Sequence, residues 1–95
     1  MAALFDWDAD KDYANRLKHG VSFPEAQLAF LDRDRVIAED AGHGDGERRY
    51  LCLGVVAGRV MTVRFTFRGE IIRIIGAGYW RKGRRTYEAT RRIHG

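Results

Sequence analysis

The sequence predicts a small α+β domain in which helices pack on one face of an antiparallel sheet. Three observations point to this class: two capped helical segments near the start, three strand-like segments separated by glycine turns, and a basic helix at the end. Ninety-five residues can bury a small core, so we assign residues 1–95 to one domain.

The chain begins with a predicted short strand over residues 4–7, and a helix follows that continues to about His19. Asp8 is placed to cap this helix, because its carboxylate can accept hydrogen bonds from the first free amides. Gly20 fits the left-handed position that commonly ends a helix, and this gives Lys18 and His19 a structural explanation at the negative end of the helix dipole. The apolar residues form a narrow stripe, namely Tyr13, Ala14 and Leu17.

A second helix is predicted over residues 23–31. Ser22 and Glu25 have the spacing of a capping box, and Pro24 is tolerated in a first helical turn. Its core-facing residues are expected to be Phe23, Ala26 and Phe30.

The strands occupy most of the remaining chain. A weak strand at residues 36–39 leads into a loop that is rich in glycine and polar residues. An antiparallel meander should follow, with strands at residues 49–56, 60–67 and 71–77 and turns at Ala57–Gly58 and Arg68–Gly69.

The middle strand of the meander alternates between two faces. One face should be core, with Val63, Phe65 and Phe67, and the other polar and cationic, with Thr62, Arg64, Thr66 and Arg68. In the last strand, Arg73 lies among isoleucines. A basic helix is expected over residues 81–92.

Charge divides the chain into two unlike halves. Residues 1–47 carry five Lys or Arg against eleven Asp or Glu, whereas residues 48–95 carry twelve against two. A basic half of this kind favours binding to a phosphate polymer, although an acidic protein partner would also fit. Cys52 lies in an apolar run and is expected to be a buried thiol. We expect no membrane span and a cytoplasmic location, because the sequence has neither a long apolar run nor a basic, apolar leader at its start.

The stretch FDWDADKDYANRLKHGVSF, residues 5–23, resembles the N-terminal pattern of the BrnT toxins of bacterial type II toxin–antitoxin systems. The likeness continues more loosely through residues 47–77. The matching positions are Trp7, Asp8, Lys11, Asn15, Lys18, His19, Gly20, Val21 and Phe23.

The resemblance implies a RelE-like fold and a ribonuclease that uses neither a metal nor another cofactor. It also implies neutralisation by an antitoxin of the BrnA type, whose ribbon-helix-helix domain would carry the complex to operator DNA. Cleavage of this kind needs a base for the ribose 2′-OH, cations for the phosphorane-like transition state and an acid for the leaving 5′ oxygen.

The candidate residues follow from these demands. Arg64, Arg73 and Arg81 are candidates for phosphate contacts, because the planar guanidinium suits two phosphate oxygens. Tyr87 is a candidate acid or a ring that stacks on a nucleobase, although Tyr79 or Trp80 could supply the stacking instead. His19 is a candidate general base. Four of the five have a structural alternative: a solvated sheet face for Arg64, the start of a soluble helix for Arg81, helix packing for Tyr87, and a helix cap or core contact for His19. Arg73 is the strongest candidate. Further RNA contacts are expected from Arg68, Tyr79, Trp80, Lys82, Arg84 and Arg85.

A metal site is not expected. His43, Asp45 and Glu47 are separated by glycines in a flexible loop, which lacks the preorganised geometry of metal sites. A nucleotide-hydrolysing enzyme is also disfavoured, because no phosphate-cradling loop is present.

The chain departs from the family pattern at three glycines. The resemblance places a serine at Gly76, an arginine at Gly78 and a glutamate near Gly83. Three functions therefore stay open: a ribonuclease toxin, a catalytically degenerate toxin homologue that binds the antitoxin and acts in repression, and an unrelated nucleic-acid-binding domain.

Overall fold

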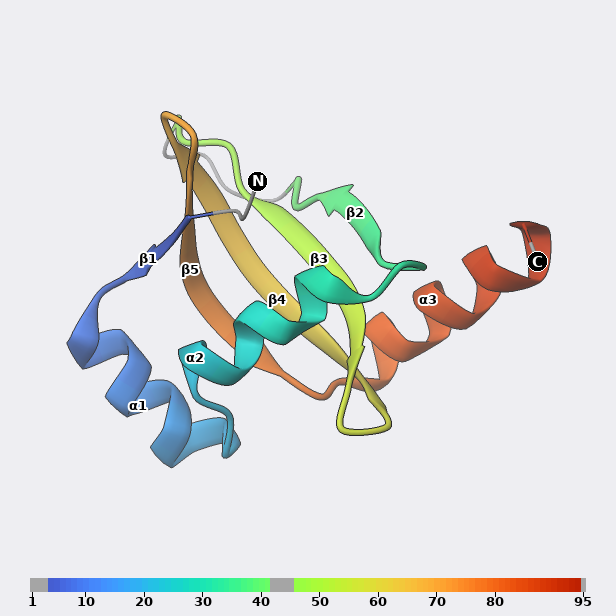
Figure 1. Ribbon diagram of the computed structural model, residues 1–95, viewed down its shortest axis with the longest axis horizontal. Coiled ribbons are helices and arrows are strands. Elements are labelled where there is room, and N and C mark those ends of the chain that lie inside the picture. The colour runs from blue at the N-terminus through green and yellow to red at the C-terminus, as the bar shows by residue number, and fades with distance from the viewer. Residues whose placement is uncertain (1–3, 42–45, 95) are drawn as a thin grey trace.

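The computed structural model describes residues 4–41 and 46–94. Within these residues, five strands form one sheet in the order β1-β5-β4-β3-β2, accompanied by three α-helices and one 3₁₀ helix (Figure 1). The elements are β1 (Phe5–Trp7), α1 (Ala9–His19), α2 (Phe23–Ala26), η1 (Gln27–Leu31), β2 (Val36–Glu39), β3 (Tyr50–Val56), β4 (Arg59–Arg68), β5 (Ile71–Gly78) and α3 (Arg81–His94).

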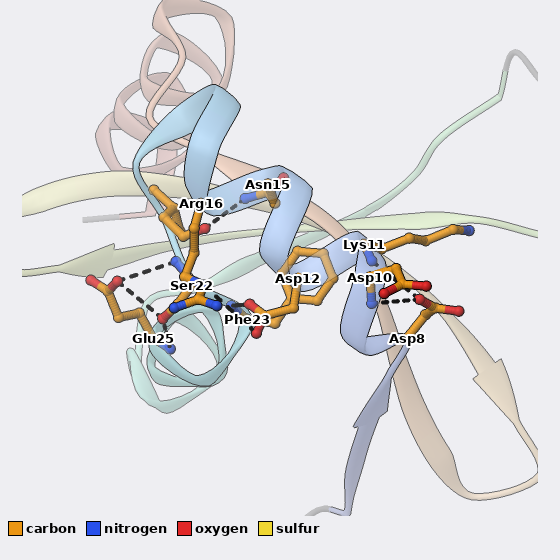
Figure 2. A network of polar contacts seen from close by, with 10 residues as sticks. Asp8, Asp10, Lys11, Asp12, Asn15, Arg16, Ser22, Phe23 and Glu25 are labelled. Atoms are coloured by element: carbon orange, nitrogen blue, oxygen red, sulfur yellow. Dashed lines mark hydrogen bonds and ion pairs between the residues drawn. The ribbon is translucent and has the colours of Figure 1, made fainter.

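The predicted caps are confirmed. The Asp8 carboxylate accepts hydrogen bonds from the amides of Asp10 and Lys11, and Gly20 ends α1 with a φ of 70°. Ser22 and Glu25 form the reciprocal capping box of α2 (Figure 2). The helix predicted over residues 23–31 is one turn of α-helix that tightens into the 3₁₀ helix η1.

The sheet is mixed rather than antiparallel throughout. The meander β3-β4-β5 and the pair β2-β3 are antiparallel, but β1 pairs with β5 in parallel, with Asp6 opposite Arg73. The prediction of an antiparallel sheet was wrong for this strand, because β1 reaches the far edge of the sheet without a hairpin turn. As predicted, the β3-β4 turn lies at Ala57 and Gly58, and both residues have positive φ. The next turn begins at Gly69 rather than Arg68.

The helices cover both faces of the sheet, which corrects the prediction that they share one. An added Cβ at Gly54 would meet the Ala29 backbone of η1, so that face of β3 packs on η1. Its neighbour Leu53 points to the opposite face, where it lies beside Gly83 of α3. Figure 1 shows α2 and η1 crossing the sheet while α3 projects away from it.

The main core lies between the sheet and the α2-η1 segment. Phe23 and Ala26 are fully buried and Phe30 packs against the cluster, as predicted, together with Val63 and Phe65 of β4. Cys52 is also fully buried, in agreement with its assignment as a buried thiol.

Three expectations about side-chain faces were wrong. The expected apolar stripe of α1 is exposed, with Tyr13 at 58% and Leu17 at 72%, and the buried residue of this helix is Asn15. Phe67 is half exposed because it lies at the end of β4. Thr62 and Thr66 are buried on the face expected to be solvated, because Gly83 of α3 lies against Thr62 and the Thr66 hydroxyl donates to the Arg48 carbonyl at 2.7 Å.

Within the described part of the chain, no helix has the length and apolar character needed to cross a bilayer.

Candidate functional site

A groove of about 1010 Å³ lies on the sheet face opposite η1, between α1 and the start of α3. Its floor is formed by β3, β4 and β5, and includes Leu53, Thr62 and Gly76. One wall is α1, the facing wall is the beginning of α3, and the end of β2 closes a third side. The groove therefore gathers segments from both halves of the chain.

Basic side chains come to this groove from three elements. Lys11 and Lys18 lie on α1, Arg64 on β4 and Lys82 on α3. The end of β2 adds acidic residues, and Asp40 holds the Arg64 guanidinium in an ion pair with an Nε–Oδ2 distance of 3.3 Å. The Arg64 side chain is nevertheless 47% exposed. It is thus oriented by a carboxylate and still open to a second anion.

Asn15 fixes α1 against the sheet. Its side-chain amide donates to the carbonyl oxygens of Val21 at 2.8 Å and Ala77 at 2.9 Å, and its Oδ1 accepts from the Ala77 amide at 3.2 Å. The described pairing of β1 with β5 ends at Ile74, so no residue of β1 pairs with Ala77. The Asn15 side chain instead makes the donor and acceptor bonds to the Ala77 backbone that a neighbouring strand would make. Asn15 thereby sets where the lysines of α1 stand in the groove.

A second set of contacts joins α1 to the start of α2. The Asp12 carboxylate accepts a hydrogen bond from the Phe23 amide at 2.8 Å and lies 3.9 Å from the Arg16 guanidinium (Figure 2). Phe23 is completely buried in the core. The α1 wall is therefore tied both to the sheet edge and to the main core.

His19 and Trp80 meet inside the groove. Their rings form an edge-to-face pair with centroids 5.1 Å apart and an interplanar angle of 82°. His19 is exposed and Trp80 is 42% exposed, so both rings remain accessible. The His19 side chain, explained in the sequence as part of a helix end, also belongs to the groove wall.

The structure brings together four of the predicted site residues and not the others. The lining includes His19, Arg64, Trp80 and Lys82. Arg73 lies outside the groove lining, where the strands β1 and β5 pair. Its Nη1 donates a hydrogen bond to the Asp6 carboxylate at 2.7 Å, and this bond lowers the pKa of Asp6. The remaining predicted arginines are exposed on β4 or α3 outside the lining, namely Arg68, Arg81, Arg84 and Arg85.

The two predicted tyrosines also lie outside the groove lining. Tyr87 is 4% exposed, and its hydroxyl donates to Asp32 Oδ2 at 2.6 Å. Burial, together with this hydrogen bond, raises the pKa of the Tyr87 phenol. The Tyr79 hydroxyl donates to the Val56 carbonyl at 3.2 Å, and its ring lies 4.0 Å from the Arg59 guanidinium carbon. The Tyr87 geometry matches the packing alternative raised from the sequence, whereas Tyr79 was expected only as an RNA contact.

On α1, three polar residues of the groove lining were not predicted as site residues: Lys11, Asn15 and Lys18. Each belongs to the N-terminal motif, and their spacing of four and then three residues places them on one face of α1. That spacing was the available signal. The position of Lys18 at a helix end has an electrostatic explanation of its own, so residue type alone does not indicate a groove.

The three glycines of the last strand and helix have different surroundings. A Cβ at Gly78 would lie 2.5 Å from the Trp80 ring, and one at Gly83 would collide with Thr62 Oγ1. At Gly76 the nearest atom would be Asn15 Oδ1, at 3.9 Å. Positions 78 and 83 are thus closed to any side chain in this packing, whereas position 76 is open toward the groove.

Within residues 4–41 and 46–94 no cluster of three or more metal-ligating side chains occurs. Of the loop residues weighed as ligands, His43 and Asp45 lie outside the described residues.

Cations and an exposed aromatic ring in one groove are the combination that proteins use to bind single-stranded nucleic acids. A comparison with curated proteins gave no match. The family model of BrnT, the ribonuclease toxin of type II toxin–antitoxin systems, matches residues 7–83. The chain belongs to this family, as its N-terminal motif predicted. Membership implies an RNA substrate and an antitoxin partner.

Proposed function

We propose that this protein is a metal-independent endoribonuclease of the RelE-like type and that RNA is cleaved in the groove between α1 and α3. The observation that carries the proposal is the convergence of Arg64, Lys82 and His19 on one concave surface from three separate elements. A polyanion gains from such a surface through charge attraction and counterion release. Because its substrate is cellular RNA, we place its action in the cytoplasm.

The proposed chemistry assigns one task to each kind of side chain. His19 takes the proton from the ribose 2′-OH, since a neutral imidazole is a good base near neutral pH. Arg64 stabilises the charge on the phosphorane-like transition state, exchanging its contact with Asp40 for the phosphate. The leaving 5′ oxygen receives its proton from a lysine ammonium group of the same groove. The products are a 2′,3′-cyclic phosphate and a 5′-OH.

The sequence predicted three further catalytic residues, Arg73, Arg81 and Tyr87. We propose that none of them takes part in the chemical step. Arg81 is exposed at the start of α3 and is suited to hold RNA outside the groove. Arg73 and Tyr87 each hold a carboxylate, which supports a role in stability. Parallel substitution of Arg64 and Arg73 tests whether Arg64 acts in cleavage and Arg73 acts only in stability.

The antitoxin partner is proposed to be of the BrnA type, with a ribbon-helix-helix domain that carries the complex to operator DNA. The exposed arginines of α3 would pair with an acidic antitoxin segment, here Arg81, Arg84 and Arg85. Coverage of the neighbouring groove would then block RNA.

The test uses purified antitoxin-free protein, single-stranded RNA and excess chelator. We expect cleavage that leaves cyclic-phosphate ends and that disappears at any position where the RNA carries a 2′-deoxyribose. A requirement for added divalent metal, or cleavage of the 2′-deoxy position, would contradict the proposed chemistry.

The alternative is a catalytically degenerate homologue that binds antitoxin without cutting RNA. It is favoured by Gly78 and Gly83, because neither position has room for a side chain where the resemblance places an arginine and a glutamate. A folded chain that binds its antitoxin and leaves RNA intact would support this alternative.

A further inference from the structure

The Trp80 side chain lies directly against the backbone of β5. An ideal Cβ on Gly78 would be 2.5 Å from Cζ2 and 2.7 Å from Cη2 of the indole. Carbon atoms in contact are about 3.5–4.0 Å apart. The indole therefore occupies the space that a side chain at position 78 would take. The position of the Trp80 ring depends on residue 78 being a glycine.

A second element holds the same ring. The His19 imidazole, at the end of α1, meets the indole edge to face at 5.1 Å. Trp80 is still 42% exposed and lines the groove. A large aromatic surface that is already fixed loses little conformational entropy when a ligand stacks on it.

The surroundings of the ring indicate the ligand. Arg64, Lys18 and Lys82 line the same groove, so an aromatic surface and several cations are offered together. A nucleotide in a single strand supplies both complements, a flat base and a phosphate. An acidic protein segment would satisfy the cations but supplies no flat π system as a regular feature.

We propose that Trp80, seated on Gly78 and braced by His19, is a stacking subsite for an unpaired nucleobase of RNA. The inference rests on the proposed function in taking RNA as the ligand, and it adds that single-stranded segments are selected. The base stacks on the indole while the adjoining phosphates meet the basic side chains of the groove. Duplex RNA would be bound weakly, since its bases are not available for stacking.

The test measures binding without cleavage. Trp7→Phe leaves Trp80 as the sole tryptophan, and a 2′-O-methyl oligonucleotide cannot supply the nucleophile. An abasic oligonucleotide with the same number of phosphates is the charge-matched probe. We expect the base-containing probe to quench Trp80 fluorescence and the abasic probe to leave it unchanged. Trp80→Ala should weaken binding of the base-containing probe by about 5- to 150-fold, the range measured for one base stacked on an aromatic residue, without affecting the abasic probe.

An exposed leucine on the opposite face of the sheet provides the control. Gly78→Ala retains the indole but displaces it, so it should lose most of the base-dependent affinity. Leu28 lies on η1, outside the groove lining, and is 48% exposed, so Leu28→Ala should bind as the parent does. Thermal melting of each variant separates displacement of the ring from loss of the fold.

Two outcomes would overturn the inference. One is equal affinity and equal Trp80 fluorescence with both probes. The other is quenching by the purified antitoxin but by neither probe, which would assign the ring to the protein partner. Cleavage is assayed separately: RNA cleavage with base-independent binding would refute the subsite and leave the nuclease standing. Base-dependent binding without cleavage would support the subsite and refute the nuclease.

Discussion

Replacement of Tyr87 by phenylalanine should destabilise the protein without impairing cleavage by the folded fraction. The change removes a 2.6 Å hydrogen bond from the buried phenol to the Asp32 carboxylate and leaves the ring in place. Hydrogen bonds to charged groups contribute about 1.5–3 kcal/mol. Because Asp32 is half-buried and water can replace the donor on its side, we expect a loss of about 1.5–2 kcal/mol, near the lower end of that range.

The loss should appear as a fall in melting temperature of roughly 6–16 °C for a domain of this size. Tyr13→Phe is the matched control, since Tyr13 is 58% exposed on α1, and it should melt close to wild type. RNA cleavage is measured at a temperature where both variants are folded. Unchanged stability combined with lost cleavage would refute the reasoning and return Tyr87 to the chemistry.

The contribution of this bond should also depend on pH. Burial raises the pKa of Asp32, but hydrogen bonds from Tyr87 and from the amides of Val55 and Asp34 outweigh it and leave the pKa below the usual 3.8. A carboxylate whose pKa is lowered on folding stabilises the fold above its unfolded pKa, and this stabilisation is lost as the pH falls through the folded value. The stability difference between wild type and Tyr87→Phe should therefore be constant above about pH 5 and shrink below about pH 4. A difference that grows on acidification would contradict this account.

Further predictions concern packing. Gly83→Ala should lower the free energy of unfolding measured by urea titration, because overpacking against Thr62 costs about 1–3 kcal/mol and exceeds the helix-propensity gain of about 1 kcal/mol. Gly76→Ala should be nearly neutral in the same titration. Equal stability of the two variants would contradict the close contact. Asn15→Asp should lower the free energy of unfolding by about 1–3 kcal/mol or more, since a carboxylate cannot donate to the carbonyls of Val21 and Ala77. A melting curve like that of wild type would show that these hydrogen bonds do not hold α1 to the sheet. Cys52, whose pKa burial raises to about 12, should resist a thiol reagent until the protein is denatured, and rapid labelling of the native protein would show that the core opens.

The sequence predicted the parts of the fold that local chemistry decides. Asp8, Ser22 and Gly20 lie at helix ends because short polar side chains and a left-handed residue satisfy free backbone groups nearby in the chain. The parallel pairing of β1 with β5 and the placement of α3 depend on contacts between residues far apart in sequence, which no local pattern records.

Part of the site was predicted, because residue type and motif are local features, whereas contacts between distant residues are not. Arg64 and His19 were identified by residue type and motif, and both lie in the groove. Arg73 was singled out for its isoleucine neighbours, but its partner is Asp6, 67 residues away in the chain. Asn15 was missed because its role comes from a strand edge that exists only in the folded molecule.

The central claim is that RNA is cleaved in the groove that Arg64 enters, and the most direct measurement compares single-turnover cleavage by Arg64→Ala with that by Arg73→Ala. Both changes remove an arginine that is paired with a carboxylate, but only Arg64 lines the groove. We expect Arg64→Ala to slow cleavage by about 100- to 1000-fold, the usual effect of losing one transition-state contact, and Arg73→Ala to cleave at a rate close to wild type once folded. Fast cleavage by Arg64→Ala together with loss of cleavage in a folded Arg73→Ala would place the chemistry outside the groove and contradict the account.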